Sequence, residues 1–361
     1  MKIRSIELEN FRNYGSLYLE LDEGINILCG DNAQGKTNIL EAVYTACTSK
    51  SQKLSKDKEM INFGADEAHI KTVIEKAGNI YRIDMHLKRN NSKGIAVNGV
   101  PIRKASELFG IANLVSFAPE DLNIIKNGPS ERRRFADMEL CQLDRIYVSD
   151  LISYNRIINQ KNKLLKSLQF GGQSEDLLDI YNDQLIRYGS SIISKRREFV
   201  LKLGELIRDI HRELSSSKEE LVIRYEPDTL EESFNDDLYS HRSSELKNMV
   251  SLVGPHKDDI SFMINDVDLR RFGSQGQQRT AVLSLKLAEI KIVEEISNNK
   301  PVLLLDDVLS ELDRSRQNML LSSIKKIQTL ITCTGIDDFV ENRFHIDKIF
   351  NVKNGQITGE T

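Results

Sequence analysis

The chain has 361 residues, of which 50 are Lys or Arg and 54 are Asp or Glu, so its formal net charge is −4. This balance gives no global attraction to nucleic acid, and any nucleic-acid site must be a local basic patch. No apolar run approaches the roughly 18 residues of a membrane span, and the charged, alternating N-terminal segment is unlike a signal peptide. The four cysteines form no C-x-x-C pair, so they indicate neither a zinc site nor a disulfide framework, and they suggest a reducing, cytoplasmic environment.

The strongest local motif is a glycine-containing loop near the start of the chain, Gly30-Asp31-Asn32-Ala33-Gln34-Gly35-Lys36-Thr37. It fits the phosphate-binding pattern G-x-x-x-x-G-K-[ST], follows an apolar run over residues 24–29 and precedes a helical pattern over residues 38–48. The alternative is a glycine loop without a ligand, and the flanking strand and helix favour phosphate binding. We expect Lys36 to reach the phosphates and Thr37 to place its hydroxyl on Mg²⁺.

A second motif lies near the end of the chain, where the uniformly apolar run Val302–Leu305 leads into Asp306 and Asp307. Such a run is typical of a buried parallel strand. We expect Asp306 to hold Mg²⁺ and Asp307 to position or deprotonate an attacking water. The alternative is a pair of aspartates that caps a turn or helix. The phosphate-binding loop in the same chain favours the magnesium interpretation.

Between these motifs the composition changes twice. Residues 1–129 are strand-rich, and Asn98-Gly99 between two valines predicts a tight hairpin. Helical periodicity then runs over residues 151–168 and again over 178–210, and Gly171–Ser174 breaks it. The pattern predicts two antiparallel helices that form an arm. The serines at 215–217 and the irregular stretch 226–240 are expected to form connections.

Residues 246–361 return to α/β character, with a long helical pattern from Gln277 to about Ile296. Ser274 and Gly276 open this helix, and they offer a hydroxyl and exposed N–H groups as a second anion site. The alternative is that Ser274 serves as an N-cap. Both interpretations can hold for one residue.

These motifs together resemble the ABC-type ATPase superfamily, and more closely its SMC-like DNA-repair branch, over nearly the whole chain. The segments that carry the resemblance are Leu8–Tyr14, Gly30–Asn38, Ser116–Leu122, Arg132–Phe135, Gly254–Asp259, Ser274–Thr280 and Leu304–Asp313. The resemblance implies an α/β ABC-type ATPase head, with a mixed sheet and a P-loop core, and an inserted helical arm. The head would comprise residues 1–129 and 246–361, and the arm residues 130–245.

By this resemblance, two heads sandwich two ATP molecules, and ATP and Mg²⁺ are the cofactors. The expected catalytic residues are Lys36, Asp306 and Asp307, and the expected metal ligands are Thr37 and Asp306. The residues expected to bind the nucleotide are Gly30, Asp31, Asn32, Ala33, Gln34, Gly35, Lys36, Thr37, Asn38, Arg12 and Asn13 in one head, with Ser274 and Gly276 from the other. The resemblance further implies an ATP-dependent DNA clamp of recombinational repair and replication, which dimerises on ATP and works with RecR and RecO in loading RecA.

The sequence departs from the general superfamily pattern at three places. Asp307 stands where a glutamate is usual, Gln275 replaces the first glycine of the signature motif, and no histidine follows the strand at Thr332–Thr334. Because aspartate is shorter than glutamate, we expect poor positioning of the attacking water. The expected activity is therefore a slow, DNA-stimulated ATPase that acts as a switch.

Candidate DNA contacts come from basic clusters in the first lobe and the arm. They are Arg132, Arg133, Arg134, Lys53, Lys56, Lys161 and Lys163. The alternatives are solvated helix faces and, for the three arginines, ion pairs with Glu131, Asp137 or Glu139. Since base-reading motifs are absent from the sequence, we expect contacts to the phosphate backbone of duplex or gapped DNA without sequence specificity.

Two other classes of protein compete with the clamp. An ATPase subunit of a transporter shares the phosphate motifs, but an arm of two amphipathic helices is not a short coupling domain. A P-loop kinase or GTPase leaves the Ser274 helix and the late aspartate pair unexplained, and the chain has no Asn-Lys-x-Asp motif for guanine.

Overall fold

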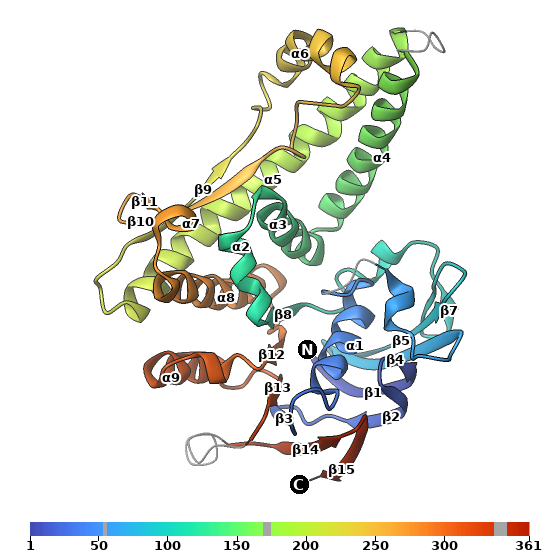
Figure 1. Ribbon diagram of the computed structural model, residues 1–361, viewed down its shortest axis with the longest axis vertical. Coiled ribbons are helices and arrows are strands. Elements are labelled where there is room, and N and C mark those ends of the chain that lie inside the picture. Colours follow the sequence, from blue (N-terminus) through green and yellow to red (C-terminus); the bar gives the residue numbers. More distant parts are fainter. Residues whose placement is uncertain (53–55, 169–174, 336–344, 361) are drawn as a thin grey trace. The chain divides into compact units, whose positions relative to one another are not determined.

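The computed structural model describes residues 1–52, 56–168, 175–335 and 345–360 (Figure 1). They form two compact units, one of residues 1–121 and 289–361 and one of residues 122–288. The boundaries expected from sequence, 129/130 and 245/246, differ from this division. The predicted helix break at Gly171–Ser174 lies outside the described residues.

The first unit contains two six-stranded sheets. The first sheet has the strand order β2-β1-β4-β5-β6-β7 and is antiparallel. Its strands are β1 (Lys2–Phe11), β2 (Tyr14–Glu20), β4 (Glu67–Lys76), β5 (Asn79–Lys88), β6 (Gly94–Val97) and β7 (Val100–Pro101). The predicted Asn98-Gly99 turn is confirmed, because Val97 pairs with Val100 and both turn residues have positive φ, 53° and 80°.

The second sheet has the order β15-β14-β3-β13-β12-β8 and is parallel except for its last hairpin. Its strands are β3 (Ile25–Cys29), β8 (Leu114–Phe117), β12 (Val302–Asp306), β13 (Thr329–Cys333), β14 (Lys348–Lys353) and β15 (Gln356–Glu360). The apolar run predicted as a buried strand is confirmed as β12, which is buried along its whole length. Because both faces of this strand are covered, it carries no polar face.

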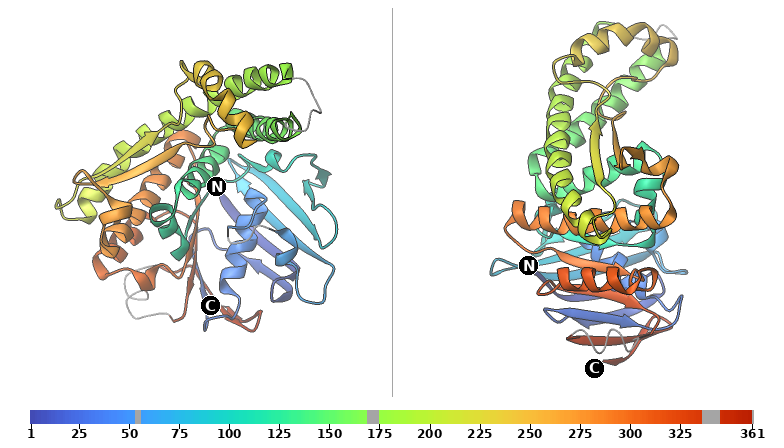
Figure 2. Two further views of the ribbon diagram at one scale, coloured as in Figure 1. Left: turned by 45° about the horizontal axis from the view of Figure 1, so that its top comes forward. Right: turned by 90° about the vertical axis from the view of Figure 1, so that its left-hand side faces the viewer.

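Helix α1 (Lys36–Thr48) packs between the two sheets and joins them into one hydrophobic core (Figure 2). Nearly all of its residues are buried, including Ile39 and Val43. The helix that follows the phosphate-binding loop is therefore fixed on two sides. Helix α9 (Arg314–Ser323) and the short 3₁₀ turns η1 (Asp57–Met60), η2 (Ala105–Leu108), η3 (Pro119–Asp121) and η4 (Leu309–Glu311) complete the unit.

The second unit is mainly helical. It contains α2 (Leu122–Lys126), α3 (Pro129–Leu143), α4 (Arg145–Leu168), α5 (Asp176–Leu214), α6 (Phe234–Asn248), α7 (Leu269–Phe272) and the first part of α8 (Gln275–Ser297). Contacts of Asp144 with Lys195 and of Asp150 with Ser191 show that α4 and α5 are antiparallel, as predicted. Helix α4 spans about 36 Å at 1.5 Å per residue, longer than the 18-residue pattern suggested.

A three-stranded sheet accompanies these helices. It has the order β11-β10-β9 and consists of β9 (Leu221–Glu226), β10 (Asp259–Ile264) and β11 (Val267–Asp268). The segment 259–264 falls within residues 246–361, which were expected to belong to the head. It lies instead in the second unit because β10 pairs with β9 along its length.

Helix α6 replaces part of the connection expected over residues 226–240. Only three of its side chains are buried, Phe234, Leu238 and Glu245. An apolar stripe this narrow gives little helical periodicity, which explains why the sequence suggested an irregular segment. Within the described ranges, no helix is both long and apolar enough to cross a membrane.

Candidate functional site

The phosphate-binding loop lies between β3 and α1, in the first unit. Gly35 directly precedes α1 with φ of 113°, a conformation that residues with a Cβ rarely adopt. A Cβ there would approach the side chain of Asn13 to 2.5 Å, and one at Gly30 would approach the carbonyl oxygen of Val352 to 2.2 Å. Both glycines are therefore required by backbone shape and by close neighbours.

The turn between β1 and β2 supports the loop. The side-chain NH₂ of Asn13 donates to the backbone carbonyl of Gln34 (3.0 Å), and the side-chain oxygen of Asn13 accepts from the side-chain NH₂ of Asn38 (2.8 Å). The buried hydroxyl of Tyr14 donates to the carbonyl of Gly35 (3.1 Å). Asn13 and Tyr14 thus position the loop; the nucleotide contact expected from Asn13 stays a prediction, and sequence reasoning assigned no role to Tyr14.

The turn between β14 and β15 holds the loop from another direction. The backbone N–H of Gly355 donates to the backbone carbonyl of Gln34 (3.0 Å), and the backbone N–H of Asn354 donates to the side-chain oxygen of Gln34 (2.6 Å). Sequence reasoning missed this contact. The Asn-Gly pair signals a turn, but nothing in the sequence indicates that the turn reaches residue 34.

The beginning of α1 is electropositive, because the Lys36 ammonium lies at the N-terminus of the helix dipole. Lys36 is only 4% exposed, and its ammonium donates to the carbonyls of Gly30 (2.5 Å) and Asp31 (3.0 Å). The first turn of α1 has no acidic residue to offset the helix dipole. The loop therefore combines a fixed cation with backbone N–H groups, which is the chemistry that binds phosphate.

A cluster of oxygen atoms joins the loop to the end of β12. The Thr37 hydroxyl donates to Asp306 Oδ1 (2.6 Å), and the Thr332 hydroxyl donates to the same oxygen (3.0 Å). Asp306 is 7% exposed, and its register partner on β13 is Thr332. The structure thus brings together the two predicted metal ligands from distant segments. Hydroxyl and carboxylate oxygens are the donors that Mg²⁺ prefers.

Asp307 has a different environment from Asp306. Its φ is 53°, in the left-handed region, and its N–H donates to the Thr332 hydroxyl (2.8 Å). Thr332 therefore fixes both aspartates. Sequence reasoning included Thr332 only as part of a strand.

Arg12 lies close to the loop but is engaged elsewhere. It forms a bidentate ion pair with Glu41 of α1 (2.7 and 2.8 Å) and donates to the carbonyl of Glu59 (3.0 Å). These bonds use three of the five N–H donors of the guanidinium, and the contact with nucleotide expected from Arg12 stays a prediction.

Ser274 and Gly276 are exposed at the start of α8, in the second unit. The Ser274 hydroxyl accepts from the N–H of Gln277 (3.2 Å), and the Gln277 side chain accepts from the N–H of Ser274 (2.9 Å). This reciprocal arrangement is a capping box. The alternative interpretation of Ser274 as a helix cap is therefore confirmed, and its exposure is compatible with a second role in anion binding.

Two of the expected DNA contacts are buried instead. Arg132 is 4% exposed and forms a bidentate pair with Asp259 (2.7 and 2.9 Å). Lys161 is fully buried, with its ammonium 2.7 Å from a carboxylate oxygen of Glu245, and burial lowers its pKa. Neither side chain can reach a phosphate without breaking its ion pair, so the predicted DNA contacts at these two positions are corrected to structural ion pairs.

The remaining candidates have mixed surroundings. Arg133 is half-buried and donates to the carbonyl of Asp258 (2.6 Å), and burial lowers its pKa. The side chains of Arg134, Lys56 and Lys163 are exposed. Lys53 lies outside the described residues.

A buried ionic network explains two of the motif segments. Arg196 of α5 is 3% exposed and pairs with Asp137 (2.7 Å) and Asp258 (2.9 Å). The network joins α3, α5 and the segment before β10. Asp258 belongs to the segment 254–259, to which Arg132 and Arg133 of the segment 132–135 also bind, so the two motif segments meet in this network.

Comparison with known proteins agrees with this architecture. The chain matches the RecF/RecN/SMC N terminal domain over residues 2–358. A solved SMC head bound to the C-winged helix domain of ScpA superposes with a TM-score of 0.57 at 16% identity, covering 98% of this chain and 94% of that one. The fold is thus that of an ABC-type ATPase head of the SMC kind.

More specific relatives cover the chain from end to end. It is 57% identical to the DNA replication and repair protein RecF of Agathobacter rectalis, covering 99% of both chains, and 56% identical to that of Lachnospira eligens, covering 100% of both. A solved structure of the recombination mediator protein RecF with ATP superposes with a TM-score of 0.93 at 35% identity, covering 99% of this chain and 97% of that one. The chain belongs to the RecF family. This confirms the DNA-repair branch over the transporter and kinase alternatives.

Proposed function

We propose that the chain is an ATP-dependent DNA-binding clamp of recombinational repair and replication. The observation that carries the proposal is the 2.6 Å contact between Thr37 of the phosphate-binding loop and Asp306 at the end of β12. It joins a phosphate site and a magnesium site within one folded unit. The relatives, which are named as replication and repair proteins, and the RecF structure with ATP support the same function.

The nucleotide would be bound by the segment Gly30–Asn38. Backbone N–H groups of the loop and the Lys36 ammonium bind the phosphates of ATP. Thr37 and Asp306 hold Mg²⁺, which neutralises charge that develops on the phosphates when it is bound. Asp307 positions the attacking water. Because its side chain is shorter than glutamate, hydrolysis is slow and times the release of the clamp.

Dimerisation would complete the site. Ser274 and Gly276 of one chain contact the γ-phosphate held by the other, so ATP joins two copies. Support comes from the exposure of both residues and from the capping box, which fixes the Ser274 hydroxyl at a helix N-terminus. Hydrolysis of ATP removes the shared phosphate and separates the copies.

The cargo would be duplex or gapped DNA, bound through its phosphates. Arg133, Arg134, Lys56 and Lys163 are the candidate cations that remain among the described residues, Lys53 stays a candidate outside them, and two copies present two sets to one duplex. By family membership, we propose RecR and RecO as partners and loading of RecA as the outcome.

DNA binding at two salt concentrations tests the clamp. We expect fluorescence anisotropy to show tighter binding to duplex and gapped DNA with ATP than without it. The affinity should fall steeply between about 50 and 200 mM salt, because each phosphate contact releases counterions. Arg134→Ala and Lys163→Ala should each reduce the salt slope by about one. A DNA affinity that changes with neither ATP nor salt concentration would contradict the proposal of an ATP-dependent clamp.

A further inference from the structure

The outer face of the first sheet carries a row of side chains that the ATP-dependent function does not use. His69 of β4 pairs in register with His86 of β5 on one side and with Glu9 of β1 on the other. Directly paired residues on neighbouring strands place their Cβ atoms about 5 Å apart on one face. Three strands therefore present two imidazoles and a carboxylate in one line.

A second carboxylate approaches both imidazoles. His86 Nε2 lies 2.8 Å from one oxygen of Glu67, and His69 Nε2 lies 4.0 Å from the other. The two imidazole rings are stacked with their centroids 4.1 Å apart. Among the described residues, these three offer ligand atoms that all lie within 4.8 Å of one another.

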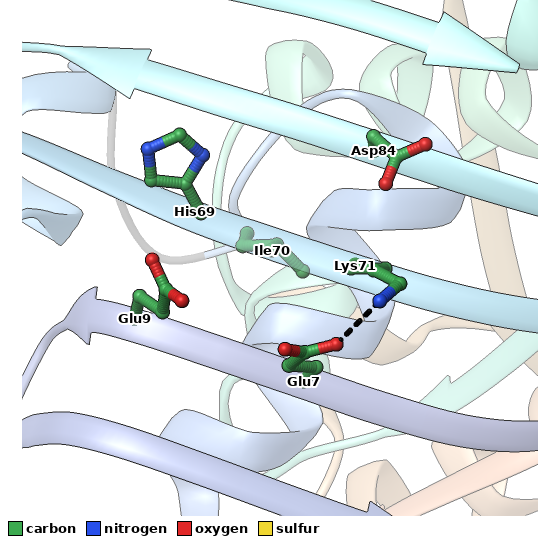
Figure 3. A pocket seen from close by; sticks show the side chains of 6 residues that line it. All are labelled: Glu7, Glu9, His69, Ile70, Lys71 and Asp84. Carbon is green, nitrogen blue, oxygen red and sulfur yellow. Dashed lines mark hydrogen bonds and ion pairs between the residues drawn. The ribbon is translucent and has the colours of Figure 1, made fainter. Parts of the chain in front are cut away.

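The cluster is open to solvent. The side chains of Glu67, His69 and His86 are 54%, 43% and 30% exposed. His69 and Glu9 also line a shallow pocket of about 150 Å³ on this face, and Figure 3 shows the two side chains on their neighbouring strands. A small ion can therefore reach the cluster without any change in the fold.

We propose that Glu67, His69 and His86 form a binding site for a divalent transition-metal ion of the Zn²⁺ class. Two imidazole nitrogens and one carboxylate oxygen are a donor set that suits Zn²⁺, Ni²⁺ or Cu²⁺, whereas Mg²⁺ and Ca²⁺ prefer oxygen ligands. Water completes the coordination, and Glu9 adds negative charge beside His69. The site is separate from the Mg²⁺ site proposed at Thr37 and Asp306.

The geometry needs only side-chain rotation. Bonds of about 2.0–2.1 Å in a tetrahedral site place ligand atoms roughly 3.3 Å apart, and the present separations are at most 4.8 Å. Rotation of the exposed rings out of their stack can close this difference.

Bound metal would cross-link β4 and β5. All three ligands belong to one hairpin, so the ion joins its strands on the face opposite the hydrophobic core. A ligand that binds only the folded state stabilises it by RT ln(1 + c/Kd) at free ligand concentration c, so the melting temperature rises with the logarithm of the ligand concentration once that exceeds Kd. The cysteine pattern gave no sign of this site because its ligands are a glutamate and two histidines, and only the pairing of β4 with β5 brings the histidines together.

The test is a titration of the chelator-treated full-length protein with Zn²⁺, monitored by calorimetry in the presence of millimolar Mg²⁺. We expect one Zn²⁺ per chain with micromolar or tighter Kd. His69→Gln and His86→Gln should each weaken binding at least tenfold, and Glu67→Gln should weaken it less. His345→Gln is the matched control, since His345 is 92% exposed and lies outside the cluster.

A second readout excludes loss of folding as the cause. With Co²⁺ in place of Zn²⁺, the visible absorption of a tetrahedral site should appear in the wild type and in His345→Gln, and should vanish in His69→Gln. The variants should keep the far-UV circular dichroism of the wild type. An absence of stoichiometric Zn²⁺ binding, displacement by millimolar Mg²⁺, or full affinity in both histidine variants would overturn the proposal.

Discussion

Asp306→Asn is expected to remove the magnesium dependence of ATP binding and to lower ATP turnover by about 100-fold. Asparagine keeps an oxygen that can accept the hydrogen bonds from Thr37 and Thr332, which lie 2.6 and 3.0 Å from Asp306 Oδ1. The substitution therefore preserves the local packing and removes the charge that would attract Mg²⁺. Any large effect on the nucleotide can then be assigned to the metal.

The magnesium dependence of binding is measured with a fluorescent ATP analogue in the presence of Mg²⁺ or EDTA. ATP turnover is measured as phosphate release in a single turnover. The variant should bind the nucleotide in EDTA as the wild type does. Asp307→Asn is the comparison: it should keep the magnesium effect on binding and lose turnover. Asp306→Asn with unchanged magnesium dependence would show that the ion is not held there.

Lys161→Ala is expected to destabilise the second unit by about 3 kcal/mol. The substitution leaves the Glu245 carboxylate buried without its cation, and desolvation of an unpaired charge is costly. Glu245 still accepts hydrogen bonds from the hydroxyl of Ser251 (3.1 Å) and the N–H of Leu252 (2.9 Å). These contacts place the expected loss at the lower end of the range for broken buried pairs.

Urea unfolding followed by circular dichroism measures this effect. Lys163→Ala is the matched control, since it lies two residues away on the same helix and is exposed. It should change stability by no more than about 0.5 kcal/mol. Lys161→Met combined with Glu245→Gln should recover much of the loss, because neither charge remains buried. If Lys161→Ala unfolded like the wild type but bound DNA weakly, Lys161 would be a DNA contact after all.

The local parts of the site could be predicted from the sequence. The Gly30–Thr37 loop, its flanking strand and helix, and β12 with Asp306 all follow from patterns within about ten residues. The Asn98-Gly99 hairpin is local in the same way. Thr37 and Asp306 were both expected to bind one Mg²⁺ because two local motifs of known chemistry imply each other, and the two side chains do lie in contact.

Residue roles that depend on contacts with distant parts of the chain could not be predicted from the sequence. Arg132 and Lys161 look like exposed basic residues in the sequence, because their partners Asp259 and Glu245 are far along the chain. Thr332 holds the two aspartates only through the pairing of β12 with β13. The support of the loop by Tyr14 likewise arises from tertiary packing.

Sedimentation velocity at micromolar protein measures whether ATP joins two copies of this chain. We expect a monomer without nucleotide, a dimer with ATP and Mg²⁺, and a monomer for Ser274→Arg even when it has bound ATP through its own loop. Far-UV circular dichroism of Ser274→Arg, whose capping box is lost, should remain that of the wild type. A wild-type chain that stays monomeric with ATP bound would show that ATP does not join two copies.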